Sequence, residues 1–192
     1  MKTPVEIKWS FFCAIACLMG GVRYFFRPVL ICWFCIGAVL AQAATYYVSP
    51  TGNDANNGTS WALSKQTIQA GINVAASGDT VLVADGTYLL TSQIEISSGV
   101  TVRSVNGSQA TILDGGGVTR CAYLYTNAVL DGFTVKNGYT SWLGGGVFLF
   151  GGTVQNCKIS RNSSFCPGGG IFVESGGTVQ DCSINGNSAT EP

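Results

Sequence analysis

The sequence predicts an all-β fold, a parallel β-helix in which short strands wind into stacked coils. Three observations support it. Residues 144–159 and 168–184 read GGGVFLFGGTVQNCKI and GGGIFVESGGTVQDCSI, so one unit recurs after 24 to 25 residues. Each unit holds short apolar/polar alternations separated by Gly, Asn, Ser and Asp, which tolerate left-handed turns. Beyond residue 43, a single segment keeps a helical period.

Residues 1–43 are predicted to be a secretory signal peptide. Two apolar stretches are separated by Arg23 and Arg27, and the second ends in Ala-Gln-Ala at residues 41–43. Positive charge, an apolar run and such a triplet are typical of a cleaved leader, which implies a secreted or cell-surface protein. Translation from Met19 would shorten this long leader to 25 residues. A membrane anchor made from both stretches is the alternative.

Residues 44–79 are interpreted as an N-terminal cap region. Residues 67–76 carry apolar side chains at helical spacing and precede the first predicted strand, residues 80–84. The end of a solenoid exposes the cross-section of its apolar core, so a terminal cap is needed. We expect this helix to be that cap, with Trp61 packing nearby.

Residues 80–192 are predicted to form about four coils, stacked at about 4.8 Å. Each coil places the same residue type over the same point of its neighbour, so inward positions become ladders. Asn162 and Asn187 occupy equivalent turns, where stacked amides can hydrogen-bond. A leucine-rich repeat has a similar period, but its leucine spacing and its helix are missing. The predicted ladders are Phe133, Cys157 and Cys182; Val135, Ile159 and Ile184; Val147 and Ile171; and Leu149 and Val173.

Earlier copies of the unit precede the two at residues 144–159 and 168–184. One lies at residues 130–135, and a weaker one is spread over residues 94–115. After the last copy, no capping segment is recognised before residue 192. The expectation is either a truncated piece of a longer solenoid or a partner that covers the open end.

Charge and composition exclude several function classes. Six basic and nine acidic residues follow residue 43, a net charge of −3, and the chain has no histidine. Mild acidity leaves no electrostatic footprint for nucleic acid. The lack of histidine excludes Ser-His-Asp and Cys-His catalysis and imidazole ligation of zinc.

Four cysteines follow the predicted leader. Cys157 and Cys182 are expected to be buried thiols, because parallel, in-register coils aim both Cβ atoms the same way and disfavour a disulfide. A bond between Cys121 and Cys166 stays open, since an export compartment would permit it.

Two stretches carry a family resemblance. YYVSPTGNDANNGTSW at residues 46–61, followed by TIQAGINVAASGDTVLVADGTY at residues 67–88, resembles the N-terminal region of secreted bacterial right-handed β-helix proteins of the pectate-lyase-like superfamily. The pairing of GGGIFV with CSINGNSA is similar to the repeats of polymorphic outer membrane proteins, although these read GGA rather than GGG. The resemblance implies a right-handed parallel β-helix and a surface-exposed adhesion role. It implies no single activity, because the superfamily hosts lyases, hydrolases, epimerases and adhesins.

Several ionisable residues are candidates for a lyase site. A lyase needs a Lys or Arg base near acidic residues that bind Ca²⁺ or neutralise a uronate carboxylate. Asp114 and Asp131 lie at strand-to-turn boundaries, where Asp commonly caps the backbone, and Lys158 takes an outward position. Structural or solvated roles are therefore favoured, and no catalytic residue is assigned. The basic candidates are Arg103, Arg120, Lys136, Lys158 and Arg161.

Two binding sites are considered. The loop residues Asn53, Asp54, Asn56 and Asn57 carry oxygen ligands for Ca²⁺, the one cofactor considered, but lack the spacing of a known calcium loop. A turn-rich surface loop is the alternative.

The second site is a file of outward aromatic residues. If Val147 and Leu149 point inward, Phe148 points outward and stacks beneath Phe172. Exposed aromatic side chains can lie against sugar rings or a partner. A covering loop or a reversed in/out phase is the alternative.

Two functions remain. The first is a non-catalytic secreted or surface β-helix for adhesion or glycan binding, with a polysaccharide or cell-surface component as partner. The second is the N-terminal part of a polysaccharide lyase or glycoside hydrolase whose active site lies beyond residue 192.

Overall fold

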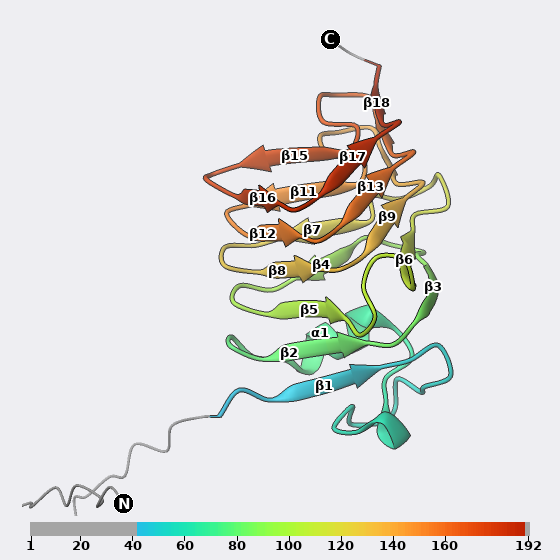
Figure 1. Ribbon diagram of the computed structural model, residues 1–192, viewed down its shortest axis with the longest axis vertical. Coiled ribbons are helices and arrows are strands. Elements are labelled where there is room, and N and C mark those ends of the chain that lie inside the picture. The colour runs from blue at the N-terminus through green and yellow to red at the C-terminus, as the bar shows by residue number, and fades with distance from the viewer. Residues whose placement is uncertain (1–41, 191–192) are drawn as a thin grey trace, which may run out of the picture. The chain divides into compact units, whose positions relative to one another are not determined.

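The computed structural model describes residues 42–190. The predicted leader, with Met19, falls outside the described residues except for its last two positions. Among residues 42–190, no helix is both long and apolar enough to cross a membrane. The chain winds around a stack of coils of parallel strands, which rises from β1 to β18 (Figure 1). The predicted all-β solenoid of about four coils is confirmed.

Four parallel sheets form the sides of the stack. The six-stranded sheet contains β1 (Thr45–Val48), β2 (Thr80–Val83), β5 (Thr101–Ser104), β8 (Val129–Asp131), β12 (Thr153–Gln155) and β16 (Thr178–Gln180). The five-stranded sheet contains β3 (Gly86–Leu89), β6 (Thr111–Asp114), β9 (Thr134–Lys136), β13 (Lys158–Ser160) and β17 (Ser183–Asn185). The four-stranded sheet contains β4 (Ile94–Ile96), β7 (Ala122–Leu124), β11 (Val147–Phe150) and β15 (Ile171–Glu174). The three-stranded sheet contains β10 (Tyr139–Thr140), β14 (Ser163–Ser164) and β18 (Ser188–Ala189).

The sequence repeat is the register of these sheets. In the six-stranded sheet Val154 pairs with Leu130 on one side and Val179 on the other. The predicted ladders of Val135, Ile159 and Ile184, of Val147 and Ile171, and of Leu149 and Val173 are all present. The weaker early copy is also present, because β4, β5 and β6 pair with β7, β8 and β9.

The turns explain the recurring Gly, Asn and Asp. Gly132, Asn156 and Asp181 occupy the same corner of three successive coils, with φ of 81°, 54° and 52°. Left-handed backbone costs most residues about 1–2 kcal/mol, and Gly, Asn and Asp least. Arg161 adopts the same conformation at the next corner, with φ of 56°. The turn geometry therefore selects the residue type at one corner and is imposed on Arg161 at the other.

A short amide ladder runs through one corner of the stack. The Asn162 side chain is 1% exposed, and its Oδ1 accepts a hydrogen bond from the Gly138 N–H at 2.7 Å. Its Nδ2 donates to the Val135 carbonyl and to Asn187 Oδ1, each at 3.0 Å. The predicted stacking of Asn162 and Asn187 is confirmed, and it ties three coils together.

The helix predicted over residues 67–76 is α1 (Ile68–Val74). Thr67 is its N-cap and accepts a hydrogen bond from the Ala70 N–H. Ile68 and Ile72 are buried, and α1 contacts β1, β2 and β4. Helix α1 therefore covers the core at the N-terminal end of the stack.

The expectation that the first strand lies at residues 80–84 was wrong. Strand β1 precedes α1 within the region interpreted as a cap, and it pairs in parallel with β2. Trp61, in the short 3₁₀ helix η1 (Trp61–Leu63), packs against Tyr47 with ring centroids 4.8 Å apart. A strand of four residues followed by a loop carries too little periodicity to stand out in the sequence.

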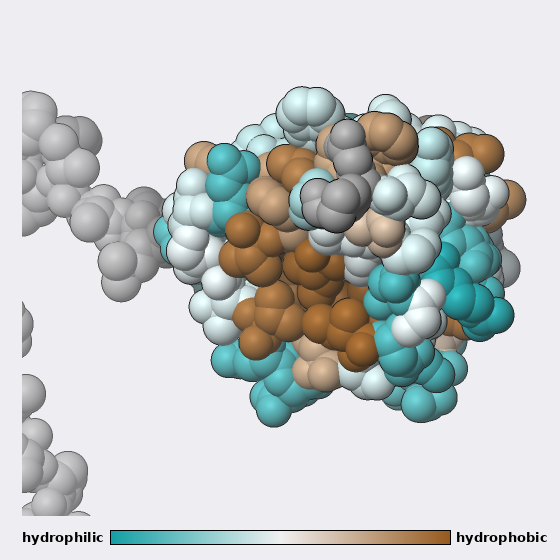
Figure 2. Space-filling model, turned by 90° about the horizontal axis from the view of Figure 1, so that it is seen from above, coloured by the Kyte–Doolittle hydropathy of each residue, from teal (hydrophilic) through white to brown (hydrophobic). Residues whose placement is uncertain are grey.

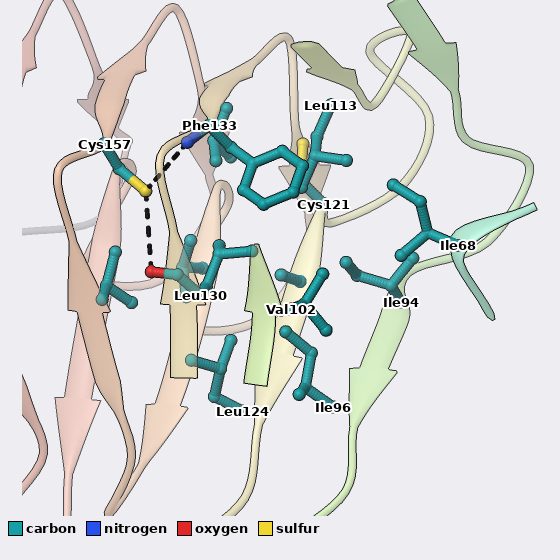
Figure 3. Close-up of a cluster of buried hydrophobic side chains, with 14 of the residues drawn as sticks. Ile68, Ile94, Ile96, Val102, Leu113, Cys121, Leu124, Leu130, Phe133 and Cys157 are labelled. Atoms are coloured by element: carbon teal, nitrogen blue, oxygen red, sulfur yellow. Dashed lines mark hydrogen bonds between the residues drawn. The ribbon is translucent and has the colours of Figure 1, made fainter. Parts of the chain in front are cut away.

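The core is one continuous column of inward side chains. Ile94, Ile96, Val102, Leu113, Leu124 and Phe133 point toward one another from different sheets (Figure 3). Cys157 and Cys121 also lie in the core as thiols. In the described structure, Cys121 therefore forms no disulfide with Cys166. Burial raises the pKa of the Cys121 thiol to about 12, so it stays protonated. These thiols act as small hydrophobic side chains.

The inward side chains of the last coil are only partly covered. Ile184 is 50% exposed and Val173 is 45% exposed, whereas their ladder neighbours Ile159 and Leu149 are fully buried. Figure 2 looks onto this end and shows an apolar patch surrounded by polar residues.

Candidate functional site

The outward side of the four-stranded sheet carries an unusual number of aromatic side chains. We call Tyr123, Tyr125, Phe148, Phe150 and Phe172 the aromatic face. Three of these residues form one file along the stack, which we call the first file: Phe148 of β11 pairs with Tyr123 of β7 and with Phe172 of β15. Tyr125 directly follows β7, and Phe150 ends β11. Because alternate residues of a strand point to opposite sides, the intervening Leu124 and Leu149 fill the core.

The first file is a stack of rings. The Tyr123 and Phe148 centroids are 4.8 Å apart with planes 7° from parallel, and Phe148 and Phe172 are 5.6 Å apart and tilted by 31°. The predicted stacking of Phe148 beneath Phe172 is therefore confirmed. Phe148 itself is only 6% exposed, unlike the open aromatic expected from the sequence. Its two faces contact its neighbours in the stack, so it supports the surface without offering a ring face to a ligand.

Arg120 covers the side of the stack. Its guanidinium carbon lies 5.3 Å from the Phe148 centroid, a cation–π contact. The same guanidinium donates to Gln93 Oε1 at 2.8 Å and to the carbonyls of Leu143 and Gly144 at 2.6 and 2.9 Å. Each of its three nitrogens thus donates a hydrogen bond, and the residue holds the loop before β11 against the rings. The Arg120 candidate for a lyase base has a structural role here.

Tyr125 and Phe150 are the most accessible members of the face, at 38% and 36% exposure. The Tyr125 ring lies 4.7 Å from that of Tyr123, which fixes its position. Acidic groups border the face: Glu95 pairs with Tyr123, and Glu174 pairs with Phe150. Burial, then the charges of Tyr125, Glu174 and Glu95, raise the pKa of Tyr123 against the opposing effect of Arg120. The face is thus apolar with an acidic margin.

Sequence reasoning found Phe148 and Phe172 but missed Tyr123, Tyr125 and Phe150. The signal that could have revealed them is AYLY at residues 122–125, which aligns with VFLF at residues 147–150. In the earlier coil, Thr-Arg-Cys at residues 119–121 stands where the later copies have Gly-Gly-Gly directly before the strand, so its equivalence is visible only in the register of β7 and β11.

The candidate cation loop is engaged in internal hydrogen bonds. Asp54 Oδ1 accepts from the N–H groups of Gln66 and Thr67, and its Oδ2 accepts from the Thr67 hydroxyl. Asn53 and Asn57 accept from backbone N–H groups two residues ahead, as in Asx turns. Asn56 donates its amide to the Ser64 carbonyl. The loop geometry is that of the turn-rich alternative, and residues 42–190 contain no group of three or more His, Cys, Asp or Glu side chains able to hold a metal.

The other ionisable candidates are separated into pairs. Arg103 Nε contacts Asp131 at 2.8 Å, and Lys136 Nζ contacts Asp114 at 3.2 Å. Lys158 is exposed and pairs in register with Ser183, as its outward assignment requires. Asp114 and Asp131 lie on different sheets, so these residues do not converge on one point.

One shallow groove of about 450 Å³ does border one of these pairs. Among its lining residues are Asp114, Asn137, Arg161 and Leu89. Asn137 donates to Asp114 Oδ1 at 2.9 Å, so the carboxylate is already held by the turn. Arg161 is the one cation among the residues that line the groove, and the Asp114 carboxylate there is already bonded to Asn137 and Lys136.

Comparison with known proteins identifies the fold. A solved structure titled pectate lyase Pel9A aligns with a TM-score of 0.52 and 20% identity, covering 74% of this chain and 38% of that chain. A rhamnogalacturonan lyase aligns with a TM-score of 0.44 and 18% identity, covering 73% and 51%. No protein-family model matches the chain, and a search of curated proteins finds no significant match. The chain therefore has the pectate-lyase-like, right-handed parallel β-helix fold, and it spans 38% of the length of Pel9A.

Proposed function

We propose that this protein is a non-catalytic β-helix that binds a glycan through the aromatic face and serves adhesion. The observation that carries the proposal is the clustering of five aromatic side chains on one outward sheet side. Apolar surface of this kind on a polar fold is usually an interaction site. Tyr125 and Phe150 are the contact residues, and the stack of Tyr123, Phe148 and Phe172 holds them in position.

The distribution of ionisable groups favours binding over catalysis. A lyase or hydrolase needs a base or acid placed beside a second charged group at one point of a cleft. Within residues 42–190, the ion pairs that involve Asp114 and Asp131 stabilise turns on separate sheets. The absence of histidine from the whole sequence removes the most common general base.

Export belongs to the same proposal. The leader predicted at residues 1–43 would place the protein outside the cell, where a polysaccharide or another cell-surface component is available. The likeness of its repeats to polymorphic outer membrane proteins agrees with such a role and remains a prediction.

The test is binding of the purified chain to a panel of insoluble and arrayed polysaccharides. The double variant Tyr125→Ala/Phe150→Ala is expected to weaken binding by about tenfold or more, as for central aromatic contacts elsewhere. Val118→Ala is the control, because Val118 is 73% exposed and lies outside the aromatic face. Unchanged binding by a folded double variant would rule out the aromatic face, and binding to proteins but not glycans would rule out a glycan ligand.

A polysaccharide lyase or hydrolase is the second candidate. The similarity of the fold to pectate lyase Pel9A favours it. In this case the catalytic residues lie in coils beyond residue 192. Incubation with uronate-containing polysaccharides, followed by ultraviolet absorbance of the unsaturated product, separates the two candidates. Turnover by the chain itself would overturn the non-catalytic proposal.

A further inference from the structure

A second surface site lies near the N-terminal end of the solenoid, at the corner between the six- and five-stranded sheets. Trp61, Ala84, Asp85, Val105 and Asn106 line a shallow, open cavity of about 300 Å³ there. Two of its walls come from equivalent positions of successive coils. Val83 of β2 pairs with Ser104 of β5, so the next residues, Ala84 and Val105, lie side by side, as do Asp85 and Asn106.

Trp61 supplies the third wall from a separate loop. Hydrogen bonds from the Gly58 N–H to the Leu63 carbonyl, and from the Tyr47 N–H to the Gly58 carbonyl, tie this loop to β1. Tyr47 meets the indole edge-on, with planes 63° apart, so the indole is fixed while 46% of Trp61 stays exposed. Among the described residues, no acceptor is bonded to the indole N–H. An immobilised but half-open indole is a pre-organised ligand contact.

The polar wall is also pre-organised. Asn106 Nδ2 donates to both carboxylate oxygens of Asp85, at 3.1 and 2.9 Å. This orients the carboxylate and leaves acceptor positions on it unfilled, since no other described group bonds to it. The Asn106 side-chain carbonyl likewise has no donor among the described residues. The Asp85 carboxylate and the Asn106 side-chain carbonyl can therefore accept hydrogen bonds from adjacent hydroxyl groups.

Charge narrows the ligand class. Asp85 is the one charged residue that lines the cavity, and no Lys or Arg lines it. Burial and then the Asp85 charge raise the pKa of the neighbouring Tyr88 phenol. An anionic sugar would be repelled at this position, whereas a neutral one would not.

We propose that the Trp61 cavity binds a neutral sugar ring, with its apolar face on the Trp61 indole and Val105 and its hydroxyl groups on Asp85 and Asn106. Flat aromatic surface beside a few fixed polar groups is the arrangement that orients small polar ligands. The cavity is too small for more than one or two rings of a chain. The site shares no residue with the aromatic face, so variants of its own residues test it independently.

The experiment is a ¹⁵N-correlated NMR titration of the purified chain with methyl glucoside, methyl galactoside, methyl mannoside and cellobiose. The indole N–H signal of Trp61 is identified by its absence from Trp61→Phe. We expect at least one neutral sugar to shift this signal and the Asn106 side-chain signal together, with a millimolar Kd. Trp61→Ala should weaken binding by about tenfold, the order expected for loss of one aromatic contact. Trp142→Ala is the matched control, because Trp142 is another exposed tryptophan, at 64%, outside the cavity.

Two further probes separate the alternatives. Galacturonate should bind more weakly than methyl galactoside, and Asp85→Asn should reduce that difference by removing the charge. Choline tests whether Trp61 and Asp85 instead hold a cation through a cation–π contact. Binding of choline in preference to every sugar, equal binding of galacturonate, no shift with any sugar, or equal losses in Trp61→Ala and Trp142→Ala would each overturn the proposal. Because Tyr125 and Phe150 are intact in these variants, failure here is distinguishable from failure of the aromatic face.

Discussion

At the scale of single residues, the corners of the stack depend on side chains that replace backbone partners. Asn162 is the clearest case, since its amide satisfies one backbone N–H and one carbonyl inside the core and also bonds to the next coil. Asp114 and Asp131 have a similar role nearer the surface. Asp131 accepts from Asn156 and Arg103, and Asp114 from Asn137 and Lys136. These residues connect neighbouring coils at points where the strands end.

Asn162→Ala is expected to lower the free energy of unfolding by about 2–3 kcal/mol, because it leaves the Gly138 N–H and the Val135 carbonyl buried without partners. Urea denaturation measures the change. Asn185→Ala serves as control, since the Asn185 side chain is exposed and bonds only to Ser183. Equal stability of the two variants would contradict the role of the amide ladder.

Acid should weaken the connection made by Asp131. Burial raises its pKa, but the hydrogen bonds from Asn156, Gln155 and Arg103 outweigh burial, so its pKa is lowered overall. A lowered folded-state pKa gives stability that is present above the unfolded value of about 4 and is lost as pH falls through the folded value. The urea concentration at the unfolding midpoint of the native chain should therefore decrease once the pH is below about 4.

Asp131→Asn tests this assignment. It should lower the midpoint near pH 7 and flatten its dependence on pH in the acid range, while Asp181→Asn, at an exposed turn, should leave the dependence as it is. If the urea midpoint of Asp131→Asn depended on acid pH as that of the native chain does, groups other than Asp131 would control the loss of stability.

At the scale of elements, strand, turn and helix are each set by a different local rule. The strands need only alternation, and neighbouring coils complete their pairing. The turns need left-handed residues, which Gly132, Asn156 and Asp181 supply. Helix α1 needs a small residue where it meets the sheet. A Cβ on Gly71 would lie 2.7 Å from Val48 Cγ2 and 2.9 Å from Val81 Cγ1, so glycine permits the helix to pack closely on β1 and β2.

Gly71→Ala should therefore destabilise the protein, although Gly to Ala in an open helix stabilises it by about 1 kcal/mol. The added methyl would force α1 away from the core, an overpacking cost of about 1–3 kcal/mol. Thermal unfolding provides the measurement, with Asn73→Ala on the exposed side of the same helix as the comparison. A higher Tm for Gly71→Ala would mean that α1 is not closely packed on the sheet.

At the scale of the whole molecule, coverage differs along the stack. Coils between α1 and β13 are covered on both sides by neighbours, whereas the inward residues of β15 and β17 are partly open. In a solenoid each coil interacts mainly with its neighbours, so local stability follows this coverage. The same ladder position can thus contribute very differently in two coils.

Ile159 and Ile184 provide a matched test, because they pair in one ladder but are 0% and 50% exposed. Ile159→Ala should cost about 2–5 kcal/mol, the usual cost of truncating a buried Ile. Ile184→Ala should cost less than about 1.5 kcal/mol, since at most half of its side-chain burial is lost. Urea denaturation of both variants measures the two losses in free energy of unfolding. Similar losses would show that the last coil is covered in solution.

The repeat of 24 to 25 residues was enough to predict the parallel β-helix, its ladders and the Asn162–Asn187 contact, because coils that stack in register must repeat their residue types. Periodicity likewise placed the capping helix to within three residues. It could not reveal β1, which belongs to no repeat, or the lack of exposure of Phe148, which depends on ring contacts and on Arg120 from the preceding coil. The Trp61 cavity was also beyond reach, because its walls are separated by more than 20 residues and meet only at a corner of the folded chain. Repetition encodes how coils lie on one another, whereas the Trp61 cavity forms where a non-repeating loop meets the coils, and only the tertiary structure determines that contact.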